Sequence, residues 1–240
     1  MRILVMLYGV LSYLLFFATF VYFIAFVGDI FVPKTLSNGG AIEGANALLI
    51  NIGLILLWGI QHSVMARGWF KDAIASLIPH HIERSTYVLA SSIVLLVLMH
   101  FWQTMDAVIW QVDNPLYQQV LRTLFAIGWL MVLLSTFLTD HFDLFGLRQT
   151  WLYFVNKSYS SVNFTERLIY RWIRHPMMLG LFFAFWAVPT MTSGHLVFSI
   201  GMSVYILIGI YFEEKSLIAE VGPAYQEYQS RTARIIPKIY

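Results

Sequence analysis

The chain has no cysteine among its 240 residues and few charged residues, and these two absences exclude several classes of protein. Without cysteine there is no disulfide, no thiolate zinc site and no cysteine nucleophile. Charged residues make up 12% of the chain and hydrophobic residues 59%, whereas a soluble domain has about 25% charged and roughly 45–50% apolar residues. The composition therefore predicts an integral membrane protein.

Sequence motifs of several enzyme and binding classes are also missing. The formal net charge is only +2 and no block of like charges occurs, so we expect no nucleic-acid partner. There is no phosphate-binding glycine loop, no dinucleotide fingerprint and no serine in a nucleophile elbow. The histidines show neither HxxxH nor HxxHH spacing, and we therefore predict no metal site.

Long apolar runs are abundant, and a helix of about 20 residues crosses the roughly 30 Å of membrane hydrocarbon. Four runs have this length, near residues 3–27, 44–66, 85–105 and 118–139. A fifth apolar region, 177–212, is too long for one ordinary span and is interrupted by VPTMTSGH. Pro189 and Gly194 mark a turn there, so we expect a helical hairpin whose first arm is shorter than a full crossing.

The fold class follows from these runs: an all-α integral membrane protein of five to six transmembrane helices, counting the hairpin. We interpret residues 1–240 as one domain, with four spans in 1–139 and the longer polar stretches in 140–240. Polar and apolar residues mix beyond residue 213, which predicts an amphipathic C-terminal helix at the membrane surface.

Lysine and arginine are distributed unevenly between the two ends of the predicted spans. All 15 except Lys34 and Arg122 fall on one side if the N-terminus is cytoplasmic. Short cytoplasmic loops carry the excess of basic residues in membrane proteins. Both termini and the active site are therefore predicted to be cytoplasmic.

The stretch RHPMMLG stands directly before the hairpin. Pro176 is suited to the first position of a helix, where no backbone N–H is needed. A helix N-terminus beside Arg174 and His175 would attract a carboxylate or a phosphate. The alternative is that both are ordinary basic residues of a membrane boundary.

Glu213 and Glu214 end the hairpin. Because neighbouring helical residues point about 100° apart, one can face inward while the other faces water. The hairpin returns the chain to its starting side, which places this pair near Arg174 and His175. A carboxylate beside arginine at a membrane boundary forms an ion pair or a ligand clamp.

The segment HFDLFGLRQ follows the fourth predicted span. His141, Asp143 and Arg148 cluster there, where ionisable groups are costly unless they meet water or one another. His141 titrates near neutrality and is a candidate base. Alternatively, these residues form a hydrogen-bonded helix end.

Together, RHPMMLG, the interrupted hairpin, Glu213-Glu214 and GPAYQEYQSRTARIIP resemble the C-terminal region of the isoprenylcysteine carboxyl methyltransferase superfamily. Its pattern is RHPxYxG, a hairpin, a Glu-Glu pair and GxxYxxY before a terminal proline. With HFDLFGLRQTWLYF, FWAVPTMTSGH and HSVMAR included, almost the whole chain resembles the bacterial methanethiol S-methyltransferase family.

This resemblance implies S-adenosylmethionine as cofactor and a small volatile thiol as substrate, with methanethiol converted to dimethyl sulfide. It makes residues 140–240 the cofactor-binding and catalytic region. It also implies a bacterial inner membrane, and leaves the oligomeric state unknown. The positions that match the cofactor motif are Arg174, His175, Pro176, Leu179, Gly180, Glu213, Glu214, Tyr225 and Tyr228. Met178 stands where the superfamily often has tyrosine, and we expect it to form an apolar wall for the cofactor.

Position and residue type make His141 and Asp143 candidate proton acceptors for the thiol, and Arg148 a candidate stabiliser of the thiolate. Other acceptors remain possible: a prenylcysteine carboxylate, hydrogen sulfide or a lipid amine. A sterol-reductase-like enzyme would be much longer. A transporter or assembly protein would need polar residues along its spans, which are mostly apolar here.

Overall fold

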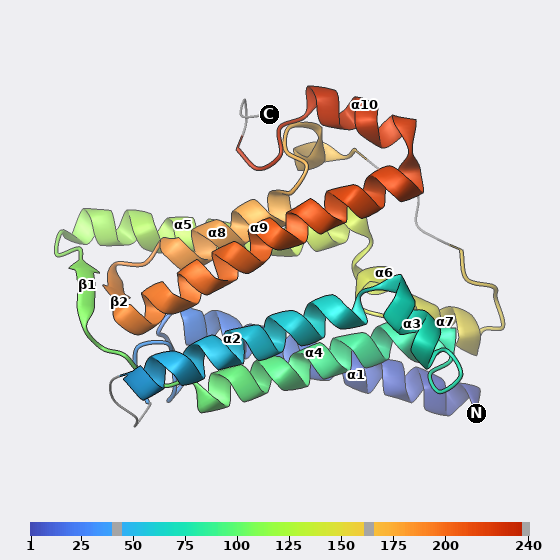
Figure 1. Cartoon of the computed structure of the whole chain (residues 1–240), viewed down its shortest axis with the longest axis horizontal. Coiled ribbons are helices and arrows are strands. Elements are labelled where there is room, and N and C mark those ends of the chain that lie inside the picture. The colour runs from blue at the N-terminus through green and yellow to red at the C-terminus, as the bar shows by residue number, and fades with distance from the viewer. Residues whose placement is uncertain (40–44, 161–165, 237–240) are drawn as a thin grey trace. The chain divides into compact units, whose positions relative to one another are not determined.

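The computed structural model describes residues 1–39, 45–160 and 166–236, and most of them are helical (Figure 1). Pro237, the terminal proline of the quoted motif, lies outside these residues. Within these described ranges, five helices are long and apolar enough to cross a membrane. They are α1 (Arg2–Val27), α2 (Ala45–Met65), α4 (His80–Phe101), α5 (Pro115–Thr139) and α9 (Ser193–Val221). The predicted all-α integral membrane fold is confirmed.

The third predicted span, 85–105, is displaced from the helix that the structure contains. Helix α4 begins at His80, directly after Pro79, and ends at Phe101. Its polar first turn extends the helix beyond the apolar run that marked the span. At the other end the helix stops before Trp102, which has a ψ of 131° and is fully buried. Because Trp102 is apolar, the apolar run in the sequence extends past the end of the helix.

The chain forms two compact units. The first unit consists of Met1–Asp106 and Asp140–Val162, and the second of Ala107–Thr139 and Asn163–Tyr240.

In the first unit, α1 and α4 run in the same direction and α2 runs against α4. Near the start of α1 and of α4, the Tyr8 and Thr86 hydroxyls lie 2.9 Å apart. Near their ends, the Trp102 indole donates to the carbonyl of Leu36 at 3.3 Å. The Asn51 side chain near the start of α2 hydrogen-bonds both backbone groups of Gln103, beyond the end of α4.

Three short helices cover the polar end of this unit: α3 (Gly68–Ile74), α6 (His141–Leu144) and α7 (Leu147–Phe154). The corner between α6 and α7 depends on Gly146, whose φ of +86° is left-handed and favours glycine. A Cβ at Gly146 would lie 2.6 Å from the backbone nitrogen of Ser85. The corner therefore packs directly on α4.

In the second unit, the expected hairpin is formed by α8 (Pro176–Trp186) and α9, followed by α10 (Pro223–Arg231). The 11 residues of α8 extend about 16 Å at 1.5 Å per residue, which confirms a first arm shorter than a crossing. A two-stranded antiparallel sheet, β1 (Val108–Gln111) with β2 (Thr190–Thr192), was not predicted. It joins the segment before α5 to the turn of the hairpin (Figure 1).

Helices α5 and α8 cross at a pair of glycines. A Cβ on Gly128 would lie 2.5 Å from the carbonyl oxygen of Gly180, and a Cβ on Gly180 would lie 2.6 Å from that of Gly128. Only glycine permits backbones to approach so closely, as small residues do at membrane helix interfaces. This crossing fixes α8, and with it the RHP segment at its start.

Candidate functional site

The segment before α8 is held by the C-terminal part of the chain. Ile173 forms a parallel bridge with Ala233, and the Arg174 backbone N–H donates to the Ala233 carbonyl at 2.8 Å. The next N–H, from His175, donates to the Arg234 carbonyl at 3.1 Å. Pro176 then occupies the first turn of α8, as predicted.

Glu214 is a buried carboxylate surrounded by arginine and histidine side chains. Its Oε1 accepts from Arg174 Nε at 2.8 Å and lies 3.2 Å from His175 Nε2. Its Oε2 lies 3.1 Å from Nη2 of Arg234. Glu213 is 49% exposed at the side chain, with its Oε2 3.6 Å from His175 Nδ1. The expectation that one glutamate faces inward and the other faces water is confirmed.

Arg174 donates its hydrogen bonds to groups inside the protein. Besides the bond to Glu214, its NH1 donates to the carbonyls of Gln229, at 2.9 Å, and Thr232. Its side chain is only 5% exposed, whereas that of Arg234 is 57% exposed. Arg174 and Glu214 thus join α9, the RHP segment and the C-terminal segment, and the groups that reach solvent are Glu213 and Arg234. Arg234 lies within the quoted stretch GPAYQEYQSRTARIIP, but it was not among the predicted site residues.

Two buried tyrosines of α10, Tyr225 and Tyr228, complete this cluster. Burial raises the pKa of Tyr225 to about 12, and the Glu214 carboxylate adds to the effect. Burial also raises the pKa of Tyr228, whose hydroxyl donates to the Tyr170 carbonyl at 2.5 Å. Both phenols therefore stay protonated at neutral pH.

The remaining motif residues lie on α8. Met178 and Leu179 are half-buried, and Gly180 is buried. Gly180 faces the crossing with Gly128, so its observed contact is with a helix backbone. Met178 and Leu179 present apolar surface next to the RHP segment.

His141 lies in the first unit in an aromatic environment. It is 6% exposed, its Nε2 lies 2.7 Å from the Tyr13 hydroxyl, and its ring centroid is 4.9 Å from that of Phe145. Burial lowers the pKa of His141 below 6.5, and the Asp140 carboxylate opposes that effect. The imidazole is therefore neutral at pH 7. Sequence reasoning missed Tyr13, because it lies 128 positions away on α1.

Asp143 and Arg148 form an ion pair at 2.9 Å. The Tyr159 hydroxyl donates to the second oxygen of Asp143 at 3.2 Å. Arg148 also donates to the carbonyl and the hydroxyl of Ser160, at 2.9 and 3.2 Å. The hydrogen bond to Asp143 is the main cause of the raised pKa of Arg148. The two side chains therefore stabilise each other.

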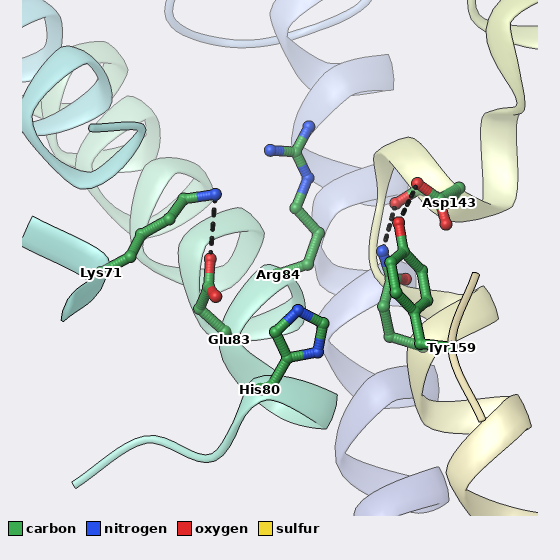
Figure 2. Close-up of a pocket in the computed structure, with 7 residues that line it drawn as sticks. Lys71, His80, Glu83, Arg84, Asp143 and Tyr159 are labelled. Carbon is green, nitrogen blue, oxygen red and sulfur yellow. Dashed lines mark hydrogen bonds and ion pairs between the residues drawn. The ribbon is translucent and has the colours of Figure 1, made fainter. Parts of the chain in front are cut away.

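A cavity of about 260 Å³ lies beside Asp143, and we call it the polar pocket (Figure 2). Its lining residues are Lys71, His80, Glu83, Arg84, Asp143, Gln149 and Tyr159. Asp143 reaches it from α6, and the other predicted catalytic residues do not line it. Sequence reasoning missed the remaining residues, because they come from separate segments that meet only in the folded unit. Within the described residues, no group of three or more His, Asp or Glu side chains is placed to hold a metal ion.

Comparisons with known proteins give a consistent picture. A methanethiol S-methyltransferase of Mycobacterium tuberculosis is 47% identical over 236 residues, which cover 98% of this chain and 97% of that protein. One of Crocosphaera subtropica is 45% identical over 238 residues, covering 99% of this chain and 93% of that protein. Nurim of Xenopus laevis is 29% identical over 165 residues, covering 65% and 58%. No solved structure matches the chain.

The family model described as NnrU protein matches residues 50–238, well over half of the chain. The relatives above 30% identity extend over almost all of it. The resemblance drawn from RHPMMLG, the Glu-Glu pair and the flanking motifs is thereby confirmed. The chain belongs to the NnrU protein family and to the family of the methanethiol S-methyltransferases.

Proposed function

We propose that this protein transfers a methyl group from S-adenosylmethionine to methanethiol and so forms dimethyl sulfide. One observation carries the proposal: the chain matches a methanethiol S-methyltransferase at 47% identity over 98% of its length. A match of this extent covers the RHP segment, the glutamate pair and the His141 segment together.

The cluster around Glu214 suits the charged end of S-adenosylmethionine, which carries a carboxylate and an ammonium group. The exposed side chains of Glu213 and Arg234 present one charge of each sign. When bound, S-adenosylmethionine supplies a methyl group already activated on a sulfonium. Met178 and Leu179 would give the apolar wall, and Tyr225 and Tyr228 the protonated phenols that support it.

The buried members of the motif would act by holding this wall rigid. Arg174, His175 and Glu214 join three segments of the second unit through charged hydrogen bonds. Pro176 starts α8, and Gly180 fixes it on α5. Rigid placement is the main requirement of methyl transfer, since aligned reactants can lower the barrier by roughly 7–11 kcal/mol.

The thiol must lose its proton before it attacks, because an ordinary thiol is mostly protonated at pH 7 and the thiolate is the nucleophile. His141 is our candidate acceptor: burial keeps its imidazole neutral at this pH, and a neutral imidazole can take a proton. Asp143 is a weaker acceptor because Arg148 and Tyr159 already bind its two oxygens. Arg148 would stabilise the thiolate only by exchanging one of its present partners.

The direct test is to incubate the purified full-length protein with S-adenosylmethionine and methanethiol. We expect dimethyl sulfide in the headspace and an equal amount of S-adenosylhomocysteine in solution. Parallel reactions with hydrogen sulfide and with a prenylcysteine identify the acceptor. A folded protein that binds S-adenosylmethionine but methylates no small thiol would exclude the proposed substrate.

A further inference from the structure

Asp140, the residue between α5 and α6, has a strained backbone. Its φ of +100° is left-handed, a conformation in which any side chain crowds the neighbouring carbonyl and glycine is therefore favoured. The next corner of the chain, between α6 and α7, has a comparable φ of +86° and is occupied by Gly146. Because glycine would relieve the strain at position 140 as well, we expect the aspartate side chain to offset it through its contacts.

Those contacts tie the start of α6 to α7. Asp140 Oδ1 accepts from the backbone N–H of Asp143 at 3.1 Å, as the side chain of an N-cap residue does. Its Oδ2 lies 4.0 Å from Nε of Arg148, and Nη1 of the same arginine donates to Asp143 Oδ1 at 2.9 Å. Arg148 thus contacts one carboxylate before His141 in the chain and one after it.

The backbone of Asp140 sets the direction of His141, which follows it directly. In its present direction His141 is 6% exposed, and its Nε2 lies 2.7 Å from the Tyr13 hydroxyl of α1. An ordinary right-handed residue has a φ of about −60°, so a return of Asp140 to that value would turn the start of α6 away from α1. The strained corner is therefore what allows the imidazole to meet Tyr13.

Asp140 also acts on the charge of the imidazole. Burial lowers the pKa of His141, and the Asp140 carboxylate opposes that effect. Asp143 has both its oxygens engaged by Arg148 and Tyr159. The other elements bring uncharged or cationic groups to the α6 segment, namely Tyr13 from α1, Arg84 from α4 and Arg148 from α7. Asp140 is thus an anion that favours proton uptake by His141.

We propose that Asp140 is a positioning residue of the methyl transfer: it turns His141 toward Tyr13 through its left-handed backbone and supports the imidazole through its carboxylate. The inference rests on the proposed base role of His141. Asp140 acts through His141 and is not itself a catalytic residue. In this arrangement Arg148 keeps its present partners, and its role is to hold α6 in place.

The first test observes His141 in the purified full-length protein without substrate, by NMR of histidine labelled with ¹⁵N in the ring. The His141 signals are those absent from His141→Ala, and Tyr13→Phe shows them without the phenol partner. Asp140→Ala, which fits a φ of +100° poorly, should shift these signals as Tyr13→Phe does, and the double variant should add nothing. Asparagine still caps a helix and tolerates a left-handed backbone. Asp140→Asn should therefore keep the Tyr13 contact, but His141 should titrate at a lower pH because the anion is gone.

The second test measures turnover. Asp140→Ala should lower kcat about 10²-fold, as a misplacement of about 1 Å can, with little change in KM. Asp140→Gly keeps the backbone without the carboxylate and should lower kcat less. Asn156→Gly is the matched control: Asn156 also has a left-handed φ, of +60°, beyond the end of α7, and its replacement should change neither kcat nor the His141 signals.

Thermal unfolding checks each variant, and Asp140→Gly takes the place of Asp140→Ala in the NMR comparison if the latter does not fold. The proposal is overturned if the His141 signals of that variant are those of the unaltered protein, or if His141 titrates at the same pH in Asp140→Asn. A protein that forms no dimethyl sulfide would refute the proposed function alone. The NMR result would still decide whether Asp140 positions His141.

Discussion

At the scale of single residues, the protein treats two adjacent glutamates in opposite ways. Glu214 is 5% exposed and is approached by three nitrogen-bearing side chains, those of Arg174, His175 and Arg234. Glu213 has one such neighbour and a half-exposed side chain. Helical geometry alone separates them, because adjacent side chains diverge by about 100°. The first holds the structure together, and the second remains open to a ligand.

Replacing each glutamate by alanine should therefore give different results. Glu214→Ala leaves Arg174 buried without its counter-ion, and we expect a loss of about 3–5 kcal/mol in the free energy of unfolding. Glu213→Ala should cost below about 1 kcal/mol, as is usual for exposed pairs, and should weaken S-adenosylmethionine binding instead. Denaturant unfolding in detergent and calorimetry measure the two effects. Equal stability of both variants would contradict the assigned roles.

His141→Ala should lower turnover about 10²–10⁴-fold, the usual contribution of a general base, and leave S-adenosylmethionine binding intact. Tyr13→Phe is the companion variant, since it removes the hydroxyl that lies 2.7 Å from His141 Nε2. We expect it to reduce kcat by about tenfold, equivalent to about 1.4 kcal/mol, with little change in KM. Normal turnover in His141→Ala would remove the base role.

The pH dependence of turnover tests the same residue. The pKa of His141 lies below 6.5 because the ring is buried. Its neutral form therefore persists as the pH falls from 7, and is lost only when the pH passes below this lowered pKa. Turnover limited by His141 should decline on the acid side at a pH below 6.5. A midpoint above 6.5, measured at saturating substrate, would argue for a different base.

At the scale of elements, the position of α8 is decided by its crossing with α5. An 11-residue helix cannot span the membrane alone, so packing must hold it in place. The Gly128–Gly180 approach allows this packing, and Pro176 sets where the helix begins. The same glycine that matches a cofactor motif is thus part of a helix interface.

Gly180→Ala should destabilise this interface by about 1–3 kcal/mol, the usual cost of overpacking. The added methyl would lie 2.6 Å from the Gly128 carbonyl, and backbone cannot yield as a side chain can. Gly209→Ala in α9 is the matched control, because nothing lies within 4 Å of its added methyl. The control should be neutral or slightly stabilising, since alanine favours helices. Thermal unfolding of the two variants checks the difference.

At the scale of the whole molecule, basic residues gather at one end of each unit. In the first unit Arg2, Lys71 and Arg84 belong to the end where α1 and α4 begin, and Lys34 lies at the opposite end with His100. In the second unit, the start of α8 lies beside the end of α9. This arrangement returns the chain to its starting side.

We therefore expect both termini to be cytoplasmic. A fluorescent-protein fusion at either terminus should be bright in bacterial cells, and an alkaline phosphatase fusion at either terminus should be inactive. A phosphatase fusion after Asp113, in the segment between α4 and α5, should be active. The reverse pattern at both places would invert the orientation.

Much of the fold could be predicted because it depends on local composition. Apolar runs of sufficient length must become helices in lipid, where every backbone polar group needs a partner within its own segment. The hairpin turn and the start of α8 followed from Pro189 and Pro176, whose ring geometry acts on the residues beside it. The ends of α4 could not be read in this way, because a polar first turn and a buried tryptophan conceal where an apolar run stops being helical.

The same distinction between local and long-range effects applies to the candidate site. The sequence by itself determined a membrane-embedded helical chain, its family and the residues of the RHP and Glu-Glu motifs, since these depend on residue type and spacing. Only the tertiary structure decided that Glu214 is the buried glutamate of the pair and meets Arg234, that Tyr13 contacts His141, and that Arg84 and Gln149 share a pocket. Such pairings join residues far apart in the chain, and their geometry is fixed only when the helices pack.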